Sequence, residues 1–182
     1  MQWTLHQWTA GIGAAHIVLG VIACATPAAA RRGLAGFPRN ALAGRVLSAA
    51  AFFWCARLVR AASLGSFDFV KPWLYVAAVA AWLAAMAFMD ELLGPRALGG
   101  LLLLAAAPLL EAARLHPAAA GRVLSVLGYV WVAAGMTWVA APWRLRNLAA
   151  AVTRTPGRLR AAGAASAAVG AALLTLAFTV LA

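Results

Sequence analysis

One histidine lies at a depth in the chain where an ionisable group points to function. His16 belongs to an apolar stretch that runs from about Trp8 to Cys24 without a charged residue. At the rise of an α-helix, His16 is about 12 Å from Trp8, near the middle of a hydrocarbon core roughly 30 Å thick. An imidazole at that depth is a candidate for substrate binding, proton transfer or haem ligation. The alternative is a neutral histidine that forms a hydrogen bond with a neighbouring helix.

The densest group of charged residues is expected near the ends of two apolar stretches. Arg57 and Arg60 are three residues apart, as are Glu111 and Arg114, so each pair shares a helix face. We predict that Arg57 and Arg60 face Glu111 and leave a net positive charge. Such a site would bind an anionic solute or a lipid headgroup. The alternative is that these arginines snorkel toward the membrane surface.

Two adjacent carboxylates, Asp90 and Glu91, lie between apolar runs and invite an interpretation as an acid–base pair. Consecutive residues of a helix diverge by about 100°, so their side chains point to different faces. The sequence therefore favours a helix end at this point, with a turn at Gly94 and Pro95 and a new helix starting after Arg96.

The composition predicts a membrane protein. Of 182 residues, 65% are hydrophobic and 10% are charged, and the mean hydropathy is +0.89. A soluble domain contains only about 45–50% apolar residues. The net charge of +11 is spread over short loops rather than gathered in one basic domain, which argues against a nucleic-acid partner. Arginine far outnumbers lysine, which we take as typical of a GC-rich bacterial genome and hence of a bacterial inner membrane.

The apolar stretches predict one polytopic domain over residues 1–182, an all-α bundle of six transmembrane helices. The expected spans are residues 8–24, 41–59, 73–89, 97–115, 123–141 and 161–182. The span at 97–115 is the least certain, because its uncharged part is short and contains Pro108. A re-entrant segment is the alternative there.

The distribution of basic residues predicts the orientation. Ten of them follow the first, third and fifth spans: Arg31, Arg32, Arg39, Arg45, Arg96, Arg144, Arg146, Arg154, Arg158 and Arg160. Five lie on the other side: Arg57, Arg60, Lys71, Arg114 and Arg122. Basic residues concentrate in cytoplasmic loops, so both termini are expected outside.

Two patterns concern how the helices pack. The segment AGRVLS occurs at 43–48 and at 120–125, and each copy is followed six residues later by a tryptophan, Trp54 or Trp131. One hypothesis is an inverted repeat of two three-helix halves, as in many transporters, and the other is chance. Glycines also recur every seven residues, which predicts close contacts between helix backbones.

The sequence leaves three functions open. The first is a small solute transporter or channel with His16, Arg57, Arg60, Glu111 and Arg114 as candidate substrate-binding residues. The second is an accessory or assembly subunit of a homo-oligomer or larger membrane complex. The third is a haem- or quinone-binding protein that uses His16. No phosphate loop, zinc-protease motif or nucleophile elbow is present, so the pattern leans away from an enzyme and leaves any cofactor unknown.

Overall fold

The computed structural model describes residues 4–88, 92–114 and 119–181, and most of that part is helical. Its elements are α1 (Leu5–Ala25), α2 (Pro27–Gly36), η1 (Phe37–Arg39), α3 (Ala41–Ala61), η2 (Gly65–Val70), α4 (Lys71–Phe88), α5 (Leu93–Arg114), α6 (Ala119–Ala140), α7 (Trp143–Thr153) and α8 (Pro156–Val180). Asp90, Glu91 and His116 lie outside the described residues.

Six of these elements are long and apolar enough to cross a membrane, namely α1, α3, η2 with α4, α5, α6 and α8. This confirms the all-α part of the predicted fold class and the presence of six helices that are able to span a membrane. The element at Leu93–Arg114 is one continuous helix of 22 residues with Pro108 inside it, so its length and composition agree with the spanning interpretation. The helices generally begin earlier than predicted. Thr4 forms a capping box with Gln7, and α5 begins at Leu93.

The turn before α5 differs from the prediction. Gly94 and Pro95 do not form the loop between the helices but belong to the first turn of α5. Backbone N–H groups in the first turn have no intrahelical acceptor, so the missing N–H of proline costs no hydrogen bond there. The residue in the left-handed region is Leu92, with φ of 63°. The left-handed residue is therefore Leu92, two positions before Gly94, and the predicted turn at Gly94 and Pro95 is wrong.

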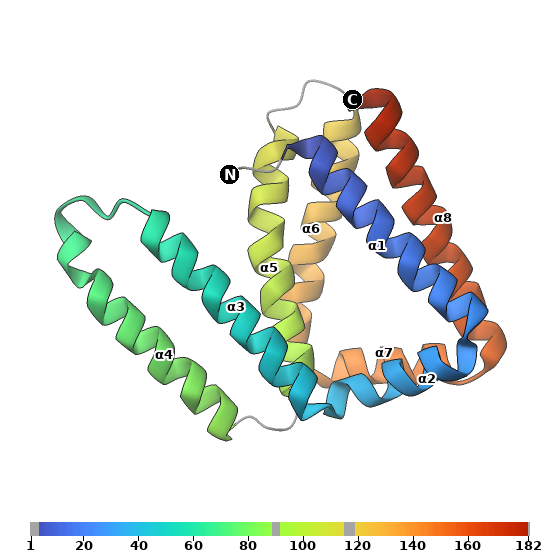
Figure 1. The fold of residues 1–182 in the computed structure, drawn as a ribbon, viewed down its shortest axis with the longest axis horizontal. Helices are drawn as coiled ribbons and strands as arrows, with labels where there is room; N and C mark the ends of the chain where they lie inside the picture. The colour runs from blue at the N-terminus through green and yellow to red at the C-terminus, as the bar shows by residue number, and fades with distance from the viewer. Residues whose placement is uncertain (1–3, 89–91, 115–118, 182) are drawn as a thin grey trace.

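Two helices were missed by the prediction, which placed loops there. α2 has 10 residues and α7 has 11, so each is about 16 Å long and too short to span a bilayer. They lie side by side along one end of the bundle (Figure 1). We call this end the basic side, because most arginines lie there, and the opposite end, which contains both termini, the terminal side.

The spanning helices form two antiparallel pairs and a separate hairpin. Figure 1 shows α1 beside α8 and α5 beside α6, with the two pairs close together on the terminal side and separated on the basic side. α2 and α7 close the base of the resulting triangle. α3 and α4 extend away as a hairpin, which contacts α5 through the Ala41 end of α3.

The packing does not follow the inverted repeat that the shared AGRVLS segments suggested. In such a repeat α1, α3 and α4 correspond to α5, α6 and α8. Because α5 packs closely on α6, the repeat would require α1 to pack equally closely on α3. Because α1 packs closely on α8, it would also require α5 to pack closely on α4. Neither pair packs in this way. The recurrence is a local resemblance between two helix starts, and the repeat prediction is wrong.

Candidate functional site

Glycines hold α1 against α8. A methyl group added at Gly20 would lie 2.5 Å from the carbonyl oxygen of Gly163, and one added at Gly13 would lie 2.9 Å from that of Gly170. Only glycine permits backbones to approach so closely, which is how helices associate where lipid supplies no hydrophobic driving force. The predicted packing role of the glycines spaced by seven is confirmed for this pair.

The second helix pair is built in the same way. Added methyl groups at Gly99 and Gly135 would each lie 2.8 Å from the other glycine's carbonyl oxygen, and one at Gly128 would meet the side chain of Leu110 at 2.7 Å. α5 and α6 are therefore fixed along their length. The two close pairs, α1 with α8 and α5 with α6, form the two walls of the space between them.

The two walls meet in an apolar cluster on the terminal side. Leu109 of α5 and Leu124 of α6 are fully buried there, and α1, α5 and α8 complete the cluster with Leu5, Ile12, Ala113 and Leu173. His6 lies at the same end, with its ring edge-on to Phe178 at a centroid distance of 5.2 Å.

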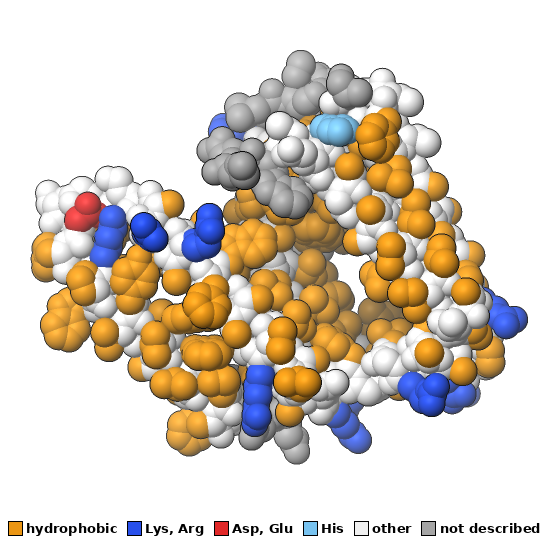
Figure 2. Space-filling view, in the orientation of Figure 1, with side chains coloured by type: hydrophobic (Ala, Val, Ile, Leu, Met, Phe, Trp, Pro, Cys, Tyr) orange, Lys and Arg blue, Asp and Glu red, His pale blue; other side chains and the backbone are white. Residues whose placement is uncertain are grey.

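Beside this apolar cluster lies a cavity of about 350 Å³, and Figure 2 shows the surface hollowed between α1 and α5. Its lining comes from one face of α1 and from Trp131 of α6: Trp8, Gly11, Ile12, Ala15, His16, Leu19 and Trp131. The lining is almost wholly apolar. The cavity is partly open rather than enclosed.

His16 is part of the cavity wall and is tied to α8. Its Nδ1 lies 3.1 Å from Oγ of Ser166, whose hydroxyl donates to the backbone carbonyl of His16 at 3.0 Å. A serine hydroxyl has one hydrogen, and Ser166 donates it to the carbonyl. The hydroxyl oxygen therefore accepts the hydrogen bond from Nδ1–H of His16. Neutral His16 is then protonated on Nδ1, and Nε2 retains its lone pair. The hydrogen bond to a neighbouring helix is confirmed, whereas a role of His16 in substrate binding, proton transfer or haem ligation stays a prediction.

Ser166 was not among the predicted site residues, although the glycine pattern contained the signal. Gly13 lies opposite Gly170, and Gly20 opposite Gly163. In an antiparallel pair with that register, the residue opposite His16 is Ser166 or Ala167. A polar residue in α8 at the level of a histidine in α1 is the expected partner.

The structure does not bring Arg57 and Arg60 to Glu111. All three side chains are exposed, and within the described part of the chain none of them forms an ion pair. The reason is that α3 and α5 touch at Gly44 and Gly94 on the basic side and then diverge, so the arginines end on the separate hairpin (Figure 1). The predicted anion site between them is wrong in this geometry.

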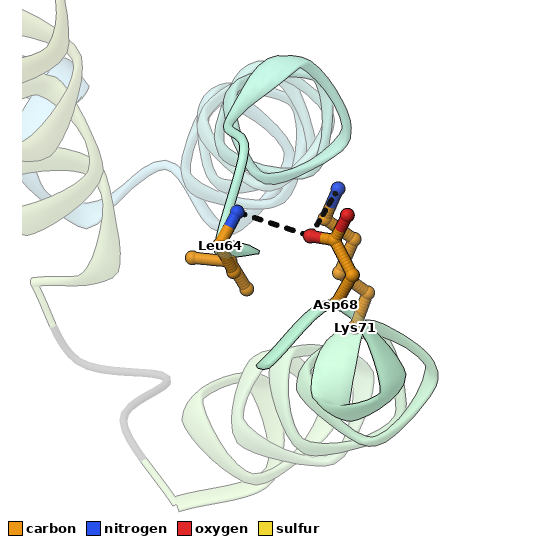
Figure 3. A network of polar contacts seen from close by, with 3 residues as sticks. All are labelled: Leu64, Asp68 and Lys71. Carbon is orange, nitrogen blue, oxygen red and sulfur yellow. Dashed lines mark hydrogen bonds and ion pairs between the residues drawn. The ribbon is translucent and has the colours of Figure 1, made fainter. Parts of the chain in front are cut away.

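Glu111 and Arg114 belong instead to a small cavity of about 300 Å³ between α5 and α6, together with Leu110, Ser125 and Tyr129. The ion pair found in the described residues joins Lys71 and Asp68, with Nζ to Oδ1 at 3.0 Å. Asp68 also accepts a hydrogen bond from the backbone N–H of Leu64 at 3.0 Å (Figure 3). This network fastens the turn between α3 and α4 and includes neither Arg57 nor Arg60.

Metal and haem sites gain no support from the geometry. Within residues 4–88, 92–114 and 119–181, no three histidine, cysteine or acidic side chains gather as a metal site would require. His6 lies on the same helix as His16, about 15 Å away along the axis. The two imidazoles therefore cannot bind the iron of one haem from its two opposite sides.

The described part of the chain is an all-helical fold with six helices long and apolar enough to cross a membrane, and it contains a partly open apolar cavity. Comparison of the chain with known protein families, with curated proteins and with solved structures finds no match. Its function is therefore inferred from its own residues and their geometry.

Proposed function

We propose that this chain is a small membrane transport protein whose substrate is an amphiphile that enters sideways from the bilayer. The observation that supports this most directly is the cavity beside His16, which is apolar, partly open and bordered by the leucine cluster. A site of this kind is concave, largely pre-formed and supplied with one orienting polar side chain, as small-molecule sites usually are.

The lining decides which class of substrate fits. An inorganic ion or a sugar would lose most of its hydration in a cavity walled by Trp8, Ile12, Leu19 and Trp131, and few groups there replace it. A molecule with an apolar body and one hydrogen-bonding group fits better, because the lone pair on Nε2 of His16 can accept one hydrogen bond. The substrate is therefore lipid-like rather than freely water-soluble.

A flux assay tests this function. The purified chain is reconstituted into vesicles that contain a short-chain phosphatidylglycerol labelled with the fluorophore NBD, and external dithionite then bleaches every probe molecule that reaches the outer leaflet. Vesicles with protein are expected to lose nearly all fluorescence, whereas protein-free vesicles retain their inner-leaflet probe. Equal bleaching in the two preparations would contradict transport of this class of molecule.

His16 gives the first site-specific prediction. His16→Phe keeps an aromatic ring of similar size but removes the acceptor, and we expect it to slow probe movement about tenfold, the value of one hydrogen bond of about 1.4 kcal/mol. The rate is measured in the dithionite assay at equal protein content, with helicity checked by circular dichroism. An unchanged rate would remove His16 from the site.

Orientation is proposed from the arginines. We place the basic side, with α2 and α7, in the cytoplasm of a bacterial cell and both termini outside its inner membrane, because cytoplasmic loops are the basic ones. A reporter active only in the cytoplasm is expected to give no signal when fused after Ala182 and a strong signal when inserted between α2 and η1. The reverse pattern would invert the proposed topology.

A second function is favoured by the hairpin. α4 contains no buried residue among those described, and α3 contributes only Gly44 and Ser48 to the interior. Trp82 joins the two helices by donating to Ser48 and stacking on Phe52, so the hairpin is held together yet projects from the bundle. Such a shape suits an accessory subunit that places one helical hairpin against a second copy or a larger complex.

Native mass spectrometry of the chain extracted in mild detergent separates these two functions. A stoichiometric partner or second copy that is lost when Val76 and Leu83, both exposed on α4, are changed to tryptophan would support the subunit role. A monomer that moves the NBD lipid by itself would support transport.

A further inference from the structure

Seven arginines gather on the basic side, on α2, on α7, in the turn that follows α7 and at the start of α8. We call them the arginine platform: Arg31, Arg32, Arg144, Arg146, Arg154, Arg158 and Arg160. All seven side chains are exposed, and none forms an ion pair with a described residue. The described carboxylates, Asp68 and Glu111, both lie toward the terminal side. The platform therefore has no described counter-ion.

α2 and α7, which bear four of the seven platform arginines, lie along the base of the bundle rather than across it. α7 buries Leu145, Ala149 and Thr153, which are spaced by four residues and form one stripe against the bundle. Arg144 and Arg146 are on the exposed surface beside that stripe. α2 packs against both α7 and α8 and exposes its two arginines. A helix with an apolar stripe and a basic face is typical of the membrane interface.

We propose that the arginine platform binds the headgroups of anionic phospholipids in the leaflet that surrounds the base of the bundle. A guanidinium group is planar and can donate two parallel hydrogen bonds to a phosphodiester, which makes arginine better suited than lysine to such a headgroup. The attraction between each basic residue and an anionic leaflet is additive to a first approximation. This interaction is independent of the transport function proposed above, since it uses other residues and another surface.

Trp143 provides a reporter within the platform. It is the first residue of α7, it is 50% exposed, and it precedes Arg144 directly. Lipids with brominated acyl chains quench indole fluorescence on contact. The chain is therefore reconstituted into phosphatidylcholine vesicles that contain phosphatidylglycerol, with bromine on one lipid or the other. The signal of the intact chain minus that of Trp143→Phe isolates the quenching at this residue.

The expected result is a preference for phosphatidylglycerol over phosphatidylcholine at Trp143, on the order of tenfold in relative binding. The combined variant R31Q/R32Q/R144Q/R146Q is expected to bring the ratio close to one. The matched control R57Q/R60Q, which removes exposed arginines from the terminal side, should leave the ratio unchanged. Replacement of the same four platform residues with lysine should keep most of the charge-driven preference but not all of it.

A measurement without substitutions guards against a variant that fails to fold. Raising the salt concentration to about 1 M shortens the screening length to roughly 3 Å, so the intact chain should lose most of its preference. The proposal is overturned if the intact chain shows no preference for the anionic lipid at Trp143. It is also overturned if that preference survives both high salt and loss of the four platform arginines.

Discussion

Replacing Gly20 with alanine is expected to lower the free energy of unfolding by about 2 kcal/mol, the usual cost of overpacking a close contact. The added methyl group would lie 2.5 Å from the carbonyl oxygen of Gly163 and 2.7 Å from the backbone nitrogen of Ala167. Both are backbone atoms of α8 and cannot rotate away as a side chain can. The helices must move apart, and the hydrogen bond between His16 and Ser166 is stretched with them.

Gly100 is the matched control for this prediction. It lies in α5, and an added methyl group there would meet no atom within 4 Å. Gly100→Ala is expected to leave stability unchanged or to raise it by up to about 1 kcal/mol, since alanine is the better helix former. Unfolding by sodium dodecyl sulfate, followed by circular dichroism, measures both variants. Equal stability of Gly20→Ala and Gly100→Ala would contradict the close packing of α1 on α8.

Filling the cavity is expected to have the largest effect on transport. Ala15 lines the cavity beside His16, and a phenyl ring at this position would occupy much of the space of about 350 Å³. We expect Ala15→Phe to reduce probe movement in the dithionite assay at least about tenfold, because a difference of 1.4 kcal/mol already has that effect. The substrate would have to displace the ring before it could reach the imidazole.

The neighbouring residue supplies the control. Ala14 is exposed and is not part of the cavity wall, since one step along a helix turns the side chain by about 100°. Ala14→Phe makes the same chemical change on a face covered by lipid and should leave the rate unchanged. If Ala15→Phe moves the probe as fast as Ala14→Phe, the cavity is not on the transport path.

The apolar spans could be predicted from the sequence because roughly 20 uncharged residues have few alternatives to crossing a bilayer. α2 and α7 could not be found in this way, because their composition is that of a basic loop and their apolar residues are few. What holds α7 as a helix is a tertiary contact, the burial of Leu145, Ala149 and Thr153. The capping box of Thr4 and Gln7 was a local signal that fixes the start of α1 and was overlooked.

The candidate site was predicted in part for a related reason. The depth of His16 follows from counting along one helix, and the structure confirms that a cavity reaches it. The predicted pairing of Arg57 and Arg60 with Glu111 required α3 and α5 to stay close along their whole length. The spacing of residues within one helix does not show whether two helices diverge. Register between α1 and α8 was available from glycines on both helices, and it would have identified Ser166.

Transport of a lipid-like substrate requires the cavity beside His16 to be open to lipid. Spin labelling at position 15 tests it most directly, in a chain whose two cysteines, Cys24 and Cys55, have been replaced by serine. Collision with oxygen reports contact with lipid, and collision with a water-soluble nickel complex reports contact with water. We predict high oxygen access and low nickel access at Ala15→Cys, close to the values at Ala14→Cys. Low access to both reagents, as expected at the fully buried Ala177→Cys, or high access to nickel would contradict a lipid-open cavity.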